Sequence, residues 1–173
     1  MSVGYRVGQF WRGLVGGALS AEATAEIAAC LSPAELRLFQ RQRPADQRHA
    51  YRVMRTLVAR GERRPALLAA ALLHDVGKSR CGLPIWGRVA IVLAEKFAPA
   101  LADAWGEGQP TGWRRPFVVR AQHADWGADM AAAAGSPPLL VGLIRSHQSV
   151  PPAGDNSAEA SLLRRLQWAD NLS

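Results

Sequence analysis

Prolines and serines recur along this chain at points where apolar helical patterns begin. Ser32 to Glu35 has the pattern of a capping box, with Pro33 at the first helical position. Pro44 and Pro65 stand ahead of apolar residues spaced three and four apart, which is typical of helices that bury one face. We therefore expect helices over 20–31, 32–43, 44–61, 65–77, 85–97, 115–135, 136–147 and 156–173.

The later helix starts and the connections complete the expected architecture. Ser136, followed by Pro137, is expected to cap the helix at 136–147, and Asn156 to Glu159 has a second capping-box pattern. The segment 98–112 is rich in Gly, Pro and acidic residues and is expected to be a loop, with room for a short helix. No run of alternating apolar and polar residues indicates a strand. The chain is therefore expected to be all-α and to fold as a helical bundle.

The length of 173 residues suits one domain with a single core. We expect this domain to span 20–173 and residues 1–19 to form an N-terminal flap or surface segment. Trp11 and its apolar neighbours mix with Arg6 and Arg12, which would suit a helix lying on a membrane. The many glycines in 1–19 disfavour an isolated helix, so a flap packed on the core is the preferred interpretation.

Composition limits the compartment and the partners. No stretch approaches the roughly 20 apolar residues of a membrane span, and 1–19 lacks the pattern of a secretory signal. Cys30 and Cys81 are far apart and indicate neither a disulfide framework nor a thiolate zinc site. These features predict a cytoplasmic protein with no transmembrane segment. The net charge of +7 favours an anionic partner and does not choose among a nucleotide, a nucleic acid and an acidic surface.

The histidines are the strongest chemical signal in the sequence. There are four, each on the apolar stripe of a different expected helix: His49, His74, His123 and His147. A single histidine on such a face is more often a hydrogen-bonded core residue than a ligand. Two carboxylates, Asp75 and Asp170, share the same inward phase, and burial without partners would cost several kcal/mol each. Divalent metal ions would pair the carboxylates and accept the imidazoles, so we expect a metal site in the bundle core.

The segment 70–78, AALLHDVGK, closely resembles the signature of the HD phosphohydrolase superfamily, in which an apolar helix ends in His-Asp followed by Gly and Lys. His49 lies 25 residues before His74, a spacing typical of that family, and WADN at 168–171 resembles its closing Ala-Asp motif. The resemblance covers roughly 48–173. It implies an HD-domain helical bundle in which His49, His74, Asp75 and Asp170 bind one metal ion. Adjacent residues on a regular helix point about 100° apart, so His74 and Asp75 can bind the same metal ion only where the helix ends. We therefore expect the helix to end at this motif, with Gly77 supplying the ending.

Two further segments indicate the subclass. QHADWGA at 122–128 resembles a helix of HD proteins with two metals, and RSH at 145–147 resembles the end of the helix that follows it. The resemblance implies that His123 and His147 complete a second metal site and that Asp75 bridges the two ions. The Gly-Tyr-Pro motif of the HD-GYP diesterases is absent, which argues against cyclic di-GMP cleavage. The single histidine at 147 is more similar to bacterial HD hydrolases that cut diadenosine tetraphosphate.

The implied function is hydrolysis of a phosphoester or phosphoanhydride bond, in a nucleotide or another small phosphorylated substrate, by a metal-activated hydroxide. Two divalent ions are expected, drawn from Fe, Mn, Co, Ni, Zn or Mg. Asp75 and Lys78 are the expected catalytic residues, with Lys78 holding a phosphoryl oxygen; alternatively, Lys78 is a solvated helix-end lysine. Arg80 and Arg145 are expected to help bind the anion. Asp125 is either a hydrogen-bond partner of a metal-bound histidine or a surface charge.

Two other classes of function compete with this interpretation. A basic nucleic-acid-binding module would agree with the net charge, but the basic residues are scattered rather than clustered with aromatics, so nucleic acid is possible but not favoured. A catalytically inactive ligand-binding or regulatory domain on an HD fold would be favoured if a metal ligand were missing. None of the six is missing.

Overall fold

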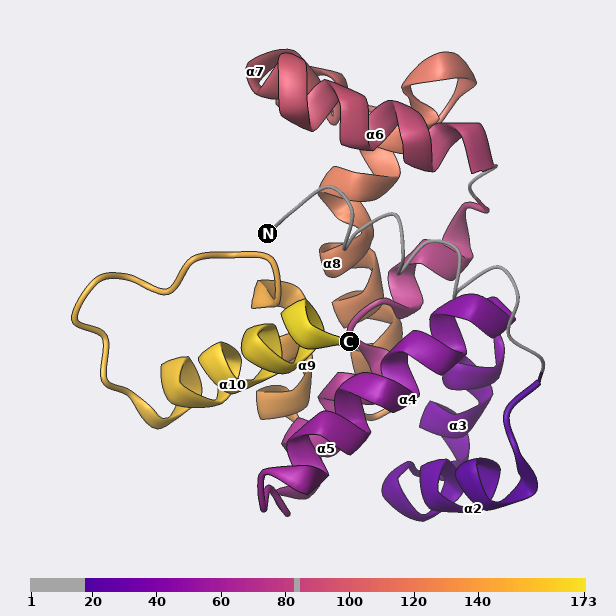
Figure 1. The fold of residues 1–173 in the computed structure, drawn as a ribbon, viewed down its shortest axis with the longest axis vertical. Coiled ribbons are helices and arrows are strands. Elements are labelled where there is room, and N and C mark those ends of the chain that lie inside the picture. The colour runs from indigo at the N-terminus through magenta and orange to yellow at the C-terminus, as the bar shows by residue number, and fades with distance from the viewer. Residues whose placement is uncertain (1–17, 83–84) are drawn as a thin grey trace.

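The computed structural model describes residues 18–82 and 85–173, and within them it is built from helices alone. The α-helices are α2 (Ala21–Cys30), α3 (Pro33–Gln40), α4 (Pro44–Ala59), α5 (Pro65–Leu73), α6 (Ile85–Phe97), α7 (Pro99–Trp105), α8 (Arg115–Ala133), α9 (Pro138–Ser146) and α10 (Ala158–Leu172). Two short 3₁₀ helices, η1 (Val76–Arg80) and η2 (Gly112–Arg114), precede α6 and α8 respectively. The expected all-α helical bundle is confirmed (Figure 1). The flap expected at 1–19 lies almost wholly outside the described residues.

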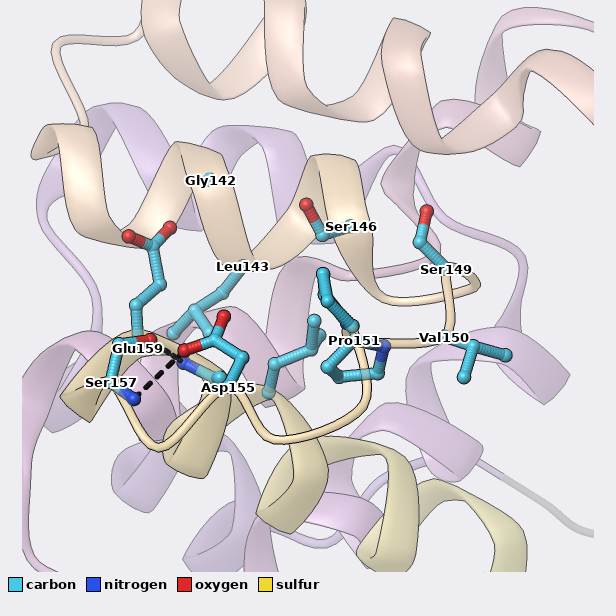
Figure 2. A pocket seen from close by; sticks show the side chains of 12 residues that line it. Gly142, Leu143, Ser146, Ser149, Val150, Pro151, Asp155, Ser157 and Glu159 are labelled. Carbon is cyan, nitrogen blue, oxygen red and sulfur yellow. Dashed lines mark hydrogen bonds between the residues drawn. The ribbon is translucent and has the colours of Figure 1, made fainter.

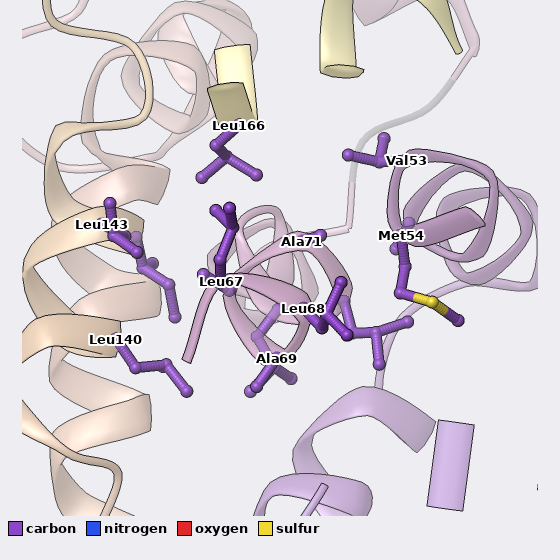
Figure 3. Close-up of a cluster of buried hydrophobic side chains, with 14 of the residues drawn as sticks. Val53, Met54, Leu67, Leu68, Ala69, Ala71, Leu140, Leu143 and Leu166 are labelled. Carbon is purple, nitrogen blue, oxygen red and sulfur yellow. The ribbon is translucent and has the colours of Figure 1, made fainter. Parts of the chain in front are cut away.

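Helix α5 is the centre of the bundle. Its residues from Leu67 to Leu73 are all buried, and a helix that is apolar all round must be enclosed on every side. Figure 3 shows Leu67, Leu68, Ala69 and Ala71 of α5 between three neighbours: α4 with Val53 and Met54, α9 with Leu140 and Leu143, and α10 with Leu166. Helices α2 and α3 pack on the same core through Ile27 and Phe39. The end of α5 is therefore held by several helices at once.

Most helix starts lie where the caps predict them. Ser32 begins α3 with the predicted capping box, because its hydroxyl accepts the Glu35 N–H and the Glu35 carboxylate accepts the Ser32 N–H. Ser136, in contrast, does not cap α9. The N-cap of α9 is Pro137, and the Ser136 hydroxyl donates to Glu35 at 2.7 Å. The buried carboxylate of Glu35 in α3 therefore binds the Ser136 hydroxyl, which was expected to cap the N-terminus of α9.

The second predicted capping box is displaced by one residue. Ser157, not Asn156, is the N-cap of α10, and its hydroxyl accepts the Ala160 N–H at 3.1 Å. Asp155 accepts the Ser157 N–H at 2.9 Å, which holds the preceding loop against the helix. Figure 2 shows these residues around a hollow of about 220 Å³ between α9, the loop 147–157 and the first turn of α10. Asp155 therefore binds the Ser157 N–H, and Ser157 in turn caps the helix by binding the Ala160 N–H.

The segment between α5 and α8 lies at one end of the molecule. The region expected to be a loop at 98–112 contains the short helix α7. Helices α6 and α7 pack on each other and on α8, and Figure 1 shows them at the top of the view, beyond the core around α5. None of the described helices has the length and apolar character needed to cross a bilayer.

Candidate metal centre

All six predicted metal ligands come together at one place in the bundle, although five helices supply them. His49 comes from α4, His74 from the C-cap of α5, Asp75 from the turn after it, His123 from α8, His147 from the C-cap of α9, and Asp170 from the last turns of α10. They form two sets, His49 with His74 and Asp170, and Asp75 with His123 and His147. Within each set, one ligand atom per residue lies within 4.8 Å of the others.

The first set is arranged around the carboxylate of Asp170. Asp170 Oδ1 lies 2.8 Å from His49 Nε2 and 3.5 Å from His74 Nε2. The His49 and His74 rings are 5.5 Å apart at their centroids. Burial would raise the pKa of Asp170, but the hydrogen bond from His49 and the charge of His74 lower it well below its ordinary value. The carboxylate is therefore ionised and available to a cation.

The second set is arranged around the other carboxylate. Asp75 Oδ1 lies 3.3 Å from His123 Nε2 and 3.9 Å from His147 Nε2, and all three residues are buried. Burial and the charge of His74 lower the pKa of His147 to about 3. A neutral imidazole is the form that binds a metal, so His147 is in that form at any ordinary pH.

Asp75 also connects the two sets. Its Oδ1 faces His123 and His147, whereas its Oδ2 lies 3.6 Å from His74 Nε2. Lys78 donates to the same Oδ2 at 2.6 Å. Burial would raise the pKa of Asp75, but the charges of Lys78 and His74 hold it well below its ordinary range. One ionised carboxylate therefore presents an oxygen to each set.

The buried imidazoles are oriented by backbone carbonyls. His74 donates from Nδ1 to Ala71 O at 2.9 Å, and His147 donates from Nδ1 to Ile144 O at 2.7 Å. His123 Nδ1 lies 2.9 Å from both Val119 O and Arg120 O. In each case the other ring nitrogen, Nε2, is turned toward the carboxylates, in the arrangement usual for metal-ligating histidines.

The Nε2 atoms of His74 and His123 supply a test of whether the residues fit a metal. Both are fully buried and lack a hydrogen-bond partner in the described structure. Buried polar atoms without partners are rare in folded proteins, and each therefore needs an explanation. Imidazole nitrogens facing ionised carboxylates are a donor set for divalent transition metals, so the residues fit such ions.

The end of α5 brings the His-Asp pair into place, but not in the way expected. The α-helix ends at Leu73, and Asp75 adopts φ −97° and ψ 4°, outside regular helical geometry. Gly77, which was expected to supply the ending, lies inside η1. A Cβ added to Gly77 would overlap His123 O and lie 2.7 Å from Gly127 N. Gly77 therefore permits contact between η1 and α8, which brings Asp75 close to His123.

Of the other residues expected in the site, one lies beside the metal ligands and three do not. Lys78 lines a chamber of about 630 Å³ together with His49, Asp75, His147 and Asp170. The side chains of Arg80, Arg145 and Asp125 do not line it.

Arg80 is exposed and lies over the Trp126 ring, 5.1 Å from its centroid. Arg145 is bound to Asp125 at 2.9 Å and to Asp129 at 2.8 Å on the exposed side of α8 and α9. Since His123 uses backbone carbonyls for its Nδ1, Asp125 is a surface charge in this structure.

Several chamber residues were not singled out from the sequence, and two of them carry polar side chains from α8 and from the residue after the α9 cap. Arg120 lies one helical turn before His123 on α8, and that spacing places it on the same face. Gln148 follows His147 directly and lines the same chamber. The turn spacing was a usable signal for Arg120. The position of Gln148 depends on the path of the chain beyond α9.

The fold and the site together define an all-helical protein with a histidine and carboxylate metal centre. The family model described as HD domain matches residues 47–173, well over half of the chain, and the chain therefore belongs to the HD domain family. Membership of this family indicates that the chain is part of the metal-dependent phosphohydrolase superfamily. No curated protein and no solved structure matches the chain.

Proposed function

We propose that this protein is a phosphohydrolase that uses two divalent metal ions to cleave a phosphoester or phosphoanhydride bond in a nucleotide or another small phosphorylated substrate. The observation that carries the proposal is the pair of ligand sets joined by Asp75, with the Nε2 atoms of His74 and His123 buried and unpartnered. A structural role for these histidines would leave two buried ring nitrogens without a hydrogen-bond partner, at a cost of about 1–3 kcal/mol each.

The proposed division of ligands follows the two sets. His49, His74 and Asp170 would hold one ion, His123 and His147 the other, and Asp75 would contribute one oxygen to each. Bound ions of this kind lower the pKa of a water molecule and stabilise negative charge on phosphoryl oxygens. Imidazole with carboxylate suits Fe, Mn, Co, Ni or Zn better than Mg.

The chain's own residues would position the substrate. Lys78 is about one-third exposed, at the wall of the chamber, so its ammonium can turn from Asp75 toward a phosphoryl oxygen. Arg120 lines the same wall, with its guanidinium paired to Asp103 at 3.0 Å. The backbone carbonyls at Ala71, Val119 and Ile144 keep the imidazoles in one tautomer, so that no ligand has to reorient during turnover.

The test is a panel of nucleotides, dinucleotides, cyclic nucleotides and simple phosphomonoesters, assayed after chelation and after addition of each metal. We expect hydrolysis to disappear with the chelator and to return with a transition metal. Asp75→Asn should lower kcat/KM by at least about a hundredfold, because a neutral amide cannot serve both sets. The matched control is Asp129→Asn, which removes an exposed carboxylate outside the chamber and should leave activity unchanged. If no member of the panel is hydrolysed with any metal, the inactive ligand-binding alternative replaces this proposal.

A further inference from the structure

A smaller cavity of about 250 Å³ adjoins the metal chamber, and we call it the annex. Lys78, Arg120 and Gln148 line both spaces. His123, a proposed metal ligand, also lines the annex. A substrate with its phosphate at the metal ligands can therefore extend into the annex past these shared side chains.

The annex differs from the chamber in chemistry. One wall is apolar and consists of Ile91 and Val92 of α6 and Val119 of α8. Val119 is fully buried in a small apolar cluster against which Ile91 packs, and Val92 is about half exposed. The chamber, in contrast, is lined mainly by charged and amide side chains. An apolar recess next to a polar reaction centre is the usual arrangement for binding the part of a ligand that does not react.

The rim of the annex indicates which apolar group it would take. Arg43 and Asp46, at the start of α4, also line the annex. An alkyl chain would gain nothing from a guanidinium and a carboxylate. A heteroaromatic base has a flat apolar face for aliphatic side chains and polar edges for a donor and an acceptor.

Resting on the proposed function, we infer that the annex between α6 and α8 binds the base of a nucleoside phosphate while the phosphate occupies the metal chamber. Ile91 and Val92 are then specificity-determining residues that contact the base, and α6 is the element that selects the substrate. Sugar phosphates without a base would fill only the chamber.

The experiment compares two ligands with the same ribose and phosphonate, of which one carries a base at C1′ and the other a hydroxyl. These are the phosphonate analogues of adenosine 5′-monophosphate and ribose 5-phosphate, which cannot be hydrolysed, with binding measured by calorimetry on the metal-loaded protein. We expect the wild type to bind the nucleotide analogue about tenfold more tightly than the sugar analogue. Val92→Asn should reduce that preference to about twofold, because a polar side chain replaces part of the apolar wall. Binding of the sugar analogue should stay unchanged, because the substitution adds no charge near the phosphonate.

Val89→Asn is the matched control. Val89 lies one turn earlier on α6, is 47% exposed compared with 49% for Val92, and does not line the annex. It should keep the full preference for the base. Equal binding of the two analogues by the wild type, or an unchanged preference in Val92→Asn, would overturn the inference. Binding of hexyl phosphonate as tight as that of the nucleotide analogue would also overturn it, since it would identify the annex as a general apolar recess.

The outcome is independent of catalysis. If the preference depends on Val92 but no substrate is hydrolysed, the annex is a base site and the proposed function fails. If substrates are hydrolysed but the wild type has no preference for the base, the annex inference alone fails.

Discussion

At the scale of single residues, Asp75 is the point on which both ligand sets converge. It is buried, ionised, and within 4 Å of three histidines and one lysine. A buried carboxylate is stable only where positive charge or metal surrounds it. The contact of Asp75 with His74 follows from their adjacent positions in the sequence. The contacts with His123, His147 and Lys78 depend on how the chain folds and packs.

The proposal of two ions predicts how metal content depends on His123 and His147. Purified wild type should contain about two ions per chain, and the double variant His123→Ala with His147→Ala about one, because only the second set loses its imidazoles. The complementary pair, His49→Ala with Asp170→Ala, should remove the other ion. Elemental analysis of metal against protein measures both. Retention of two ions in the first double variant would mean that these histidines are not ligands.

At the scale of elements, the important contact is that of η1 with α8. These elements approach closely because both carry glycine at the crossing, Gly77 in η1 and Gly127 in α8. The contact places Asp75, one residue before η1, beside His123 in the middle of α8. The geometry of the second ligand set therefore depends on backbone proximity as well as on the ligands themselves.

Gly77→Ala tests this dependence. Because the new Cβ would overlap His123 O, η1 must move away from α8, and we expect a loss of about 1–3 kcal/mol in the free energy of unfolding. Affinity for the second ion should fall as well, since Asp75 moves with η1. Gly82→Ala is the control, because its Cβ would meet only the flexible end of Arg43. Urea unfolding and metal titration measure the two effects, and a Gly77→Ala protein equal to Gly82→Ala in both would contradict this account.

At the scale of the whole molecule, the site joins helices that are distant in sequence. Helices α4, α5, α8, α9 and α10 all supply ligands, and the same helices enclose the apolar core. Metal binding should therefore stabilise the entire fold, by about 2.7 kcal/mol when the free ion is at a hundred times its Kd. Protonation of the ligands competes with that binding, so the stability should depend on pH.

Burial lowers the pKa of His74, but Asp75 and Asp170 outweigh that effect and raise it from 6.5 to about 9. In protein stripped of metal, the stabilising proton on His74 is fully present below pH 6.5 and is lost as the pH rises through 9. The loss should be on the order of 3 kcal/mol. His147 acts in the opposite sense. Its lowered pKa makes the folded protein less stable as the pH falls from 6.5 toward 3, because the unfolded chain binds that proton more readily.

Stability without metal should therefore be greatest near pH 6.5, and saturating metal should oppose the decline toward pH 9, because the ion displaces the proton from His74. Urea unfolding across this range, with chelator and with metal, measures both curves. His74→Gln is the control and should remove the decline above pH 6.5. A metal-free protein that becomes more stable between pH 6.5 and 9 would contradict the charge assigned to His74.

The helices and the inward-facing residues could be predicted from the sequence, because both depend on local spacing. Capping signals and apolar periodicity are read from neighbouring positions, and they placed all four histidines and both aspartates on buried or half-buried faces. Local patterns failed where a distant group intervened, as when Glu35 bound Ser136 and Asp125 and Asp129 bound Arg145. Which helices meet could not be predicted in this way and is known from the fold alone. The fold therefore also decided the division of six ligands into two sets, the contact of Lys78 with Asp75, and the annex between α6 and α8. Distances between helices arise from packing of whole faces, and the spacing along one helix carries no information about them.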